Sequence, residues 1–198
     1  TDCTFGGANE ADGNKAKFGG AINHVKHKVD GTTKNGLVTL KGGVFRNNVA
    51  NECGGAICEE SGMKIERSNG EGTLFQDNKV TAETAVDCGG GAIWAETYST
   101  SSNKNVKVTG AVFKGNEAFS GGACLVYGNS SGLYFTECTF GGENSDDANY
   151  ARGNSGDGGG GSLYMDKKSY STFTRCTITG DHAKRYGGSV YAHSNGGN

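Results

Sequence analysis

The apolar residues of this chain recur with the period of a β-strand. Pairs of apolar residues two positions apart, separated by a polar one, occur at Val38–Leu40, Val106–Val108 and Leu133–Phe135. This alternation is typical of a strand with one buried face. Nowhere does an apolar pattern at i, i+3, i+4 and i+7 continue over two helical turns. The hydrophobic pattern therefore predicts an all-β protein.

Two short motifs recur along the chain in a fixed order. The first is an apolar anchor followed three residues later by Asn, as in Phe45–Asn48, Phe75–Asn78 and Phe113–Asn116. Its weaker forms are Ile178–Asp181, Phe5 with Asn9, and Phe140 with Asn144. The second motif is a Gly-Gly tetrapeptide, found at 19–22, 54–57, 90–93, 121–124, 160–163 and 187–190. Because each anchor precedes a Gly-Gly, the sequence predicts six copies of one structural unit.

Each unit contains three predicted strands: the alternating one, the anchor strand and the one that starts at Gly-Gly. The extra residues of the longer units collect after the anchor Asn (78–89 and 144–159) and after the Gly-Gly strand (22–36 and 94–105). Strands of fixed spacing joined by loops of free length are typical of a solenoid. We therefore predict one parallel β-helix domain over residues 1–198. Six coils at about 4.8 Å each give a rod roughly 29 Å long.

The first and last predicted coils are incomplete. The first begins at its anchor strand, and the last stops just after its Gly-Gly strand. An open coil leaves backbone groups of its strands without partners. We expect residues 1–198 to be either a segment of a longer rod or a subunit that stacks head to tail with copies of itself into a filament.

The repeated residues have predicted structural roles. The anchors should point inward and stack from coil to coil, and the Asn after each anchor should adopt the left-handed conformation at a corner and join a hydrogen-bonded ladder. The Gly-Gly pair should mark a corner that needs a positive φ or a close backbone approach. The residues expected in these roles are Phe45, Asn48, Gly54, Gly55, Phe75, Asn78, Gly90, Gly91, Phe113, Asn116, Gly121 and Gly122.

The GGAI and F-x-x-N motifs resemble the repeat of the chlamydial polymorphic outer-membrane proteins. Both tetrapeptides are intact over 45–57 and 75–93. The resemblance implies a right-handed parallel β-helix of the kind displayed as the passenger of an autotransporter adhesin. It also implies a non-enzymatic protein that is extracellular or on a cell surface. Its expected partners are a second copy of the chain, or a surface glycan or protein.

Seven cysteines suit an oxidising compartment. Cys53 and Cys88 precede the Gly-Gly of neighbouring coils and are the better candidates for a disulfide. Cys3, Cys138 and Cys176 share one register, two residues before an anchor, and form either a buried thiol ladder or a bridge, or meet across a subunit junction. Directly stacked residues lie about 4.8 Å apart, further than the roughly 3.8 Å that a relaxed disulfide prefers between its Cβ atoms.

Composition and charge exclude several classes of protein. The chain has 36 glycines and no proline, which excludes collagen and proline-rich linkers. A net charge of −2 without a basic block argues against nucleic-acid binding. No apolar run approaches the 18 residues or so that a membrane-spanning helix needs.

The remaining motifs are isolated ones. Asn129 begins a glycosylation acceptor, and the stretch 153–162 partly imitates a calcium-binding repeat, which leaves a bound calcium ion open. The four histidines do not converge and are interpreted as surface side chains. Cysteine and histidine spacings do not fit zinc ligation. We therefore predict no cofactor and no resident metal.

Two alternative functions follow from smaller features. The adjacent carboxylates of Asp146 and Asp147 resemble those of polysaccharide-processing β-helix enzymes, although the other motifs of such enzymes are missing. A flat row of threonines would favour an ice- or glycan-binding surface. Thr39, Thr109 and Thr136 are predicted to share a register, which Lys64 interrupts.

Overall fold

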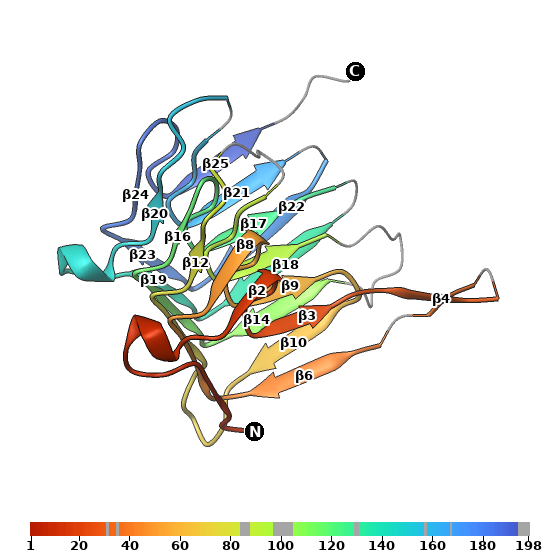
Figure 1. Ribbon diagram of the computed structural model, residues 1–198. Helices are drawn as coiled ribbons and strands as arrows, with labels where there is room; N and C mark the ends of the chain where they lie inside the picture. The colour runs from red at the N-terminus through yellow and green to blue at the C-terminus, as the bar shows by residue number, and fades with distance from the viewer. Residues whose placement is uncertain are drawn as a thin grey trace.

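The chain folds into a stack of six coils, a parallel β-helix (Figure 1). The computed structural model describes residues 1–30, 32–34, 36–83, 88–96, 105–128, 131–156, 158–166 and 168–193. The strands of the coils pair in parallel with their equivalents in adjacent coils, so the chain advances along the stack one strand spacing at a time. Separate from these sheets, β4 (His27–Val29) and β5 (Thr32–Lys34) pair antiparallel with each other. The prediction of an all-β parallel β-helix with about six coils is confirmed.

Two of the four parallel sheets were expected from the apolar pattern. The anchor sheet is built from the strands that carry the anchors: β1 (Thr4–Phe5), β7 (Val44–Arg46), β11 (Leu74–Gln76), β15 (Val112–Lys114), β19 (Thr139–Gly141) and β23 (Thr177–Thr179). The alternating sheet contains β6 (Val38–Lys41), β10 (Met63–Glu66), β14 (Val106–Thr109), β18 (Gly132–Thr136) and β22 (Tyr170–Thr174).

The Gly-Gly sheet follows each Gly-Gly pair. It contains β3 (Ile22–His24), β9 (Ile57–Glu59), β13 (Ile93–Ala95), β17 (Cys124–Val126), β21 (Leu163–Asp166) and β25 (Val190–His193). Its apolar side chains lie in the core beside the anchors and the alternating strands.

A fourth sheet corrects the prediction of three strands per coil. It lies between the anchor strand and the Gly-Gly, and consists of β2 (Lys15–Phe18), β8 (Val49–Cys53), β12 (Lys79–Val80), β16 (Glu117–Ala118), β20 (Tyr150–Ala151) and β24 (His182–Ala183). Ala50, Val80 and Ala118 form a small buried cluster of their own on these strands. One small inward residue per strand is too weak a signal to give an alternating pattern.

The anchors form a continuous aromatic column inside the rod. Phe45 and Phe75 stack with ring centroids 4.9 Å apart, and Phe75 stacks on Phe113 at the same distance. Phe5 and Phe140 extend the column at its two ends, at 4.5 and 4.7 Å. The parallel register, which places Phe75 opposite both Phe45 and Phe113, is what superposes the rings.

A ladder of side-chain amides runs beside this column. The Nδ2 group of Asn48 donates to Oδ1 of Asn78 at 2.8 Å, and Asn78 donates likewise to Asn116 at 3.0 Å. The same Nδ2 groups also donate to the carbonyl of the anchor one coil back, as Asn78 does to Phe45 at 2.9 Å. Each buried amide is therefore satisfied on both sides, which a buried polar group requires.

The ladder in the first and fifth coils uses different residues from those predicted. Asn14 and Asn149 occupy it, while Asn9 and Asn144 precede two short 3₁₀ helices, η1 (Glu10–Asp12) and η2 (Ser145–Asp147). The inserted turn moves the ladder position five residues along the chain. In the sixth coil Asp181 takes the place of Asn and accepts from Asn149.

The left-handed residue at this corner is also not the one predicted. Asn47 and Asp77, which precede the ladder residues, have positive φ angles of 56° and 55°, and Gly115 has 63°. Among the described residues, the ladder asparagines Asn48 and Asn78 are absent from this conformation. Their side chains are instead aligned along the rod for hydrogen bonding.

The two glycines of each pair have separate reasons to be glycine. The first adopts a positive φ, 63° at Gly54 and 67° at Gly90. The second lies against the next coil: a Cβ on Gly91 would come within 2.1 Å of the Gly122 carbonyl oxygen. Only a glycine allows the backbones to approach this closely.

Candidate functional site

The outer face of the Gly-Gly sheet carries a second apolar cluster. Because side chains alternate along a strand, the residue after each inward one points away from the rod axis. At the pairing positions of the sheet these outward residues are Asn23, Cys58, Trp94, Leu125, Tyr164 and Tyr191. Leu125 and Tyr164 are fully buried although they lie outside the coil core. A buried outer face shows that side chains cover this sheet on both sides.

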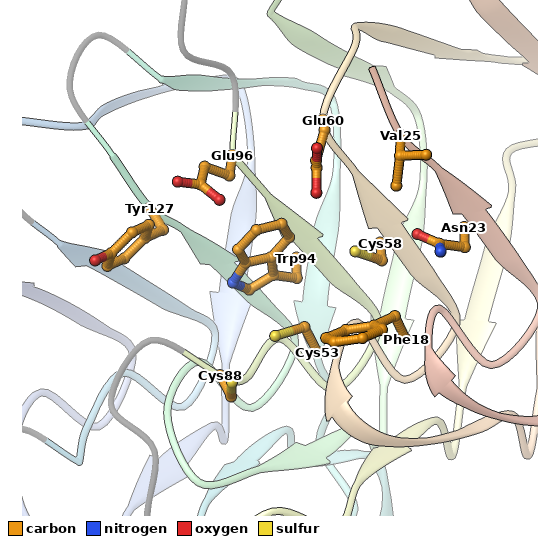
Figure 2. Close-up of a pocket in the computed structure, with 10 residues that line it drawn as sticks. All are labelled: Phe18, Asn23, Val25, Cys53, Cys58, Glu60, Cys88, Trp94, Glu96 and Tyr127. Atoms are coloured by element: carbon orange, nitrogen blue, oxygen red, sulfur yellow. The ribbon is translucent and has the colours of Figure 1, made fainter. Parts of the chain in front are cut away.

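At one end of this cluster lies a pocket of about 500 Å³ (Figure 2). Its centre is formed by Trp94 of β13 and Cys58 of β9, which are paired across the two strands. The other lining residues are Phe18, Asn23, Val25, Cys53, Glu60, Cys88, Glu96 and Tyr127. Its volume lies within the range of small-molecule sites, and its lining is mostly apolar with a few polar groups, which is the usual composition of such sites.

Two carboxylates belong to this pocket. Glu60 follows β9 and Glu96 follows β13, and both lie on the same side of Trp94 in Figure 2. The Nζ of Lys26 approaches the Glu60 carboxylate at 3.9 Å. The pocket therefore combines a large aromatic side chain with acidic groups, an arrangement suited to a ligand with an apolar body and polar substituents.

Two thiols of the pocket, those of Cys53 and Cys58, are held in the protonated form. Burial raises the pKa of Cys58 to about 12, with the neighbouring Glu60 and Glu59 carboxylates adding to the effect. A hydrogen bond with the Cys88 thiol, and then burial, raise the pKa of Cys53. Since the thiolate is the reactive nucleophile of cysteine, these raised pKa values favour binding over nucleophilic catalysis at this site.

The structure brings Cys53 and Cys88 together as predicted, in the thiol form. All seven cysteines lie within the described ranges, and no disulfide joins any two of them. Figure 2 shows the Cys53 and Cys88 sulfurs on the side of the pocket opposite the two glutamates. A Cys53–Cys88 disulfide therefore stays a prediction.

The other predicted cysteine group lies away from the pocket, and Cys138 is its buried member. The Cys138 thiol is buried and lies 3.4 Å from the Thr136 carbonyl and 3.5 Å from the Val108 carbonyl. Cys176 in the next coil contacts the Thr174 carbonyl, and Cys3 at the other end of the sheet is exposed. Cys138 is therefore a small core residue with Cys176 packed against the same core, whereas the prediction of a buried ladder is wrong for the exposed Cys3. Cys124 of β17 is fully buried in the core.

The carboxylates proposed for an enzyme do not form an acid–base pair. Hydrogen bonds from Asn144 and Lys114 lower the pKa of Asp147, and the Lys114 Nζ lies 3.2 Å from its carboxylate. Asp146 is exposed on η2. General acid catalysis by a carboxyl group requires a raised pKa, whereas the pKa of Asp147 is lowered.

The glycosylation acceptor and the calcium-like stretch lie wholly or partly outside the described residues. Asn129 lies outside the described residues, as does Asp157, the carboxylate within 153–162. In the described part of the chain, no group of three or more His, Cys, Asp or Glu side chains could hold a metal ion.

The prediction that His24 is a surface side chain is wrong. Its Nδ1 lies 2.7 Å from the fully buried carboxylate of Glu59.

The predicted threonine register is wrong in one position. Thr39 pairs with Lys64, whereas Thr109 pairs with Thr136. Since Lys64 pairs with Lys107 rather than with a threonine, Thr39 belongs to a different row. The alternating sheet therefore has no continuous threonine row across its described strands.

The pocket was not predicted from the sequence. Cys53 and Cys88 were interpreted as a disulfide pair, and the other lining residues were given no role. The signal was present in the Gly-Gly strands, where Ile93-Trp94-Ala95 and Cys124-Leu125-Val126 are apolar at successive positions. A strand that is apolar on both faces is buried on both. Glu96 and Tyr127 could not be placed this way, since only the coil stacking brings them to one pocket.

Comparison with known proteins agrees with the motifs. Residues 42–58 match the Chlamydia polymorphic membrane protein repeat. The matched segment runs through β7 and β8 into β9, and so includes Phe45, Asn48 and the Gly54–Gly55 pair. No curated protein and no solved structure matches the chain. The resemblance is confirmed over this segment, and the chain is a parallel β-helix that carries a repeat similar to that of the Chlamydia polymorphic membrane proteins.

Proposed function

We propose that this protein is a non-enzymatic, extracellular adhesive β-helix displayed on a cell surface. The observation that carries the proposal is the match of residues 42–58 to a membrane-protein repeat inside an uninterrupted β-helical stack. A solenoid of this kind presents a long, regular exterior while its core holds the shape. Such an exterior suits attachment to large partners.

The pocket chemistry supports binding rather than turnover. The Cys53 and Cys58 thiols of the pocket are protonated. Outside the pocket, the carboxylate of Asp147 is engaged by Lys114. Within the described residues no helix is long and apolar enough to cross a membrane.

Adhesion is tested with beads coated with the folded chain and applied to epithelial cell monolayers. We expect adhesion well above that of albumin-coated beads, and competition by the soluble chain. The matched control is the same chain with Phe75→Ala and Phe113→Ala, which removes two fully buried rings of the core column and should abolish the fold. Binding equal to that of albumin would contradict the proposal.

A second candidate function is head-to-tail self-association. The strands at both ends of the described stack, such as β6 and β22, pair with a neighbour on one side only. Unpaired strand edges are templates for pairing with another chain. Electron microscopy of the purified chain distinguishes the two outcomes: filaments with an axial repeat of roughly six strand spacings, about 29 Å, support assembly, and single short rods contradict it.

A further inference from the structure

The outer face of the alternating sheet is lined by two parallel rows of side chains. In the first row, adjacent strands place next to one another Thr39, Lys64, Lys107, Tyr134 and Thr172. In the second row, two positions further along the strands, Thr109, Thr136 and Thr174 follow one another. The inward residues between the rows are apolar. The face therefore combines cations, aromatic rings and hydroxyl groups.

The two lysines of the first row form a doubly positive site. Lys64 and Lys107 are register partners on β10 and β14, and parallel neighbours lie about 4.8 Å apart. Among the described residues neither lysine takes part in a salt bridge. Glu66, two residues along the strand from Lys64, is the register partner of Lys41 on β6. Two adjacent ammonium groups repel each other, and an anion placed between them relieves that repulsion.

An aromatic pair lies beside the lysines. The rings of Tyr134 and Tyr170 meet edge to face with centroids 5.7 Å apart. Asn105 holds both hydroxyls, because its Nδ2 donates to Tyr134 at 3.4 Å and its Oδ1 accepts from Tyr170 at 3.2 Å. The hydrogen bond with Tyr170 is the main cause that raises the pKa of Tyr134 to about 12, so its hydroxyl is neutral.

These groups surround a groove of about 390 Å³. It is lined by Asn105, Lys107, Val108, Thr109, Tyr134 and Thr136. Tyr170 is 40% exposed at the end of the same sheet. The groove therefore offers one ammonium group, an aromatic surface, and hydroxyl and amide groups that both donate and accept hydrogen bonds.

We propose that this lysine–tyrosine face, defined by Lys64, Lys107, Tyr134 and Tyr170, binds a sulfated polysaccharide. The proposal rests on the adhesive function proposed above and assigns it a ligand class. Sulfate groups are anionic and would occupy the space beside the paired ammonium groups. The tyrosine rings provide apolar surface for the C–H face of a sugar ring, and the threonines and Asn105 provide partners for its hydroxyls. An open sheet face accommodates an extended chain better than a closed cavity does.

Nucleic acid fits this face less well than a sulfated glycan. The whole chain carries a net charge of −2, and the basic site consists of two residues rather than a broad patch. Proteins that bind nucleic acid through the phosphate backbone rely on many Lys and Arg contacts. A sugar chain instead gains from the aromatic and hydroxyl groups that surround the two lysines.

The test measures binding of the full chain to immobilised heparin, with chemically desulfated heparin as the probe for sulfate. We expect the chain to bind heparin in low salt, with affinity that falls as salt is added, and to bind desulfated heparin at least about tenfold more weakly. Lys64→Gln with Lys107→Gln should weaken heparin binding about tenfold or more and reduce its salt dependence. Tyr134→Ala should weaken binding while the salt dependence stays unchanged.

The matched control is Lys15→Gln with Lys184→Gln, which changes the net charge equally at two exposed lysines outside this sheet. Full heparin binding by the control supports the proposed face. An equal loss in both double variants, or equal competition by duplex DNA, would overturn the proposal in favour of non-specific charge attraction. If the chain binds heparin but coated beads do not adhere to cells, the adhesive function fails while the glycan site stands. If coated beads adhere to cells but the chain does not bind heparin, the proposed glycan site fails while the adhesive function stands.

Discussion

Asp181 occupies the ladder position that asparagine holds in the preceding coils. Its Oδ1 accepts from the backbone N–H of Asn149 at 2.8 Å and from its Nδ2 at 3.1 Å, and its Oδ2 accepts from the Ser162 hydroxyl. Burial nevertheless raises its pKa above the ordinary value of 3.8. The folded chain therefore favours the protonated carboxyl group, and the charged form reduces stability at neutral pH.

Asp181→Asn should stabilise the protein at pH 7 by about 1 kcal/mol, the scale of one buried hydrogen bond. Because the pKa of Asp181 is raised in the folded state, its ionised carboxylate destabilises the fold at pH values above that pKa. This destabilisation disappears as the pH falls toward 3.8, where the carboxyl group of the unfolded chain is also protonated. The advantage of the variant should therefore shrink as the pH is lowered through that window. Urea unfolding at several pH values measures it.

The control for this prediction is Asp146→Asn, which removes a carboxylate at an exposed position on η2. It should leave the pH dependence of unfolding nearly unchanged. A constant difference between Asp181→Asn and the parent chain from pH 7 to pH 4 would show that titration of Asp181 is not the cause.

At the scale of one element, the corner before each Gly-Gly strand depends on its second glycine. A Cβ on Gly91 would lie 2.1 Å from the Gly122 oxygen and 2.6 Å from the Glu117 nitrogen, both of which belong to the next coil's backbone. The equivalent Gly188 differs, since its nearest contact would be an ordinary 3.5 Å to the Asp181 oxygen. The same substitution therefore has different consequences in two coils.

We expect Gly91→Ala to destabilise the chain by about 3 kcal/mol or more, the upper range for single substitutions that force a backbone shift. Gly188→Ala should change stability by less than about 0.5 kcal/mol, as is usual at sites without a steric conflict. Thermal unfolding followed by circular dichroism compares the two variants. Equal losses of stability in the two variants would contradict the conclusion that contact with the next coil is what requires glycine at position 91.

Elements with a strong internal pattern could be predicted from the sequence, and elements defined by stacking could not. The anchor and Gly-Gly strands were found because Phe45, Phe75 and Phe113 repeat with their glycines. The short strand β12 was missed because its two residues hold one inward side chain, Val80. Its existence depends on hydrogen bonds to neighbouring coils, which leave no local pattern in the sequence.

Less of the candidate sites than of the fold could be predicted from the sequence, because their residues are brought together by the stacking of neighbouring coils. The proximity of Cys53 to Cys88 was predicted, because both flank the same corner in successive coils. The sequence indicated Lys64 only as an interruption among threonines, and its proximity to Lys107 follows from the parallel pairing of β10 with β14. The approach of Trp94 to Glu60 likewise depends on neighbouring coils.

At the scale of the whole molecule, the proposed extracellular location would expose its thiols to oxidants. With glutathione disulfide, we expect the Cys53 and Cys88 thiols to form one disulfide. The pair loses two electrons and two protons, and the glutathione disulfide is reduced to two glutathione thiols. Thiolate formation is the slow requirement, because the pKa of Cys53 is raised, and the rate should increase with pH.

Closing a loop of this length should stabilise the rod by about 4 kcal/mol if the disulfide is unstrained. Alkylation followed by mass spectrometry should find five of the seven thiols remaining. A Cys58→Ser variant should behave like the parent chain, and Cys53→Ser should retain its six thiols. Linkage through Cys58, or between Cys138 and Cys176, would contradict the assignment.

The amide ladder gives the molecule a direction. From Asn14 to Asn149 each side-chain amide donates to the ladder residue of the following coil, and from Asn48 onward each also accepts from that of the preceding coil. The amide dipoles therefore point the same way along the axis. A coil inserted between two others would present the same acceptor to the coil before it and the same donor to the coil after it. Gene duplication could thus lengthen the rod one coil at a time, while a reversed coil would set donor against donor.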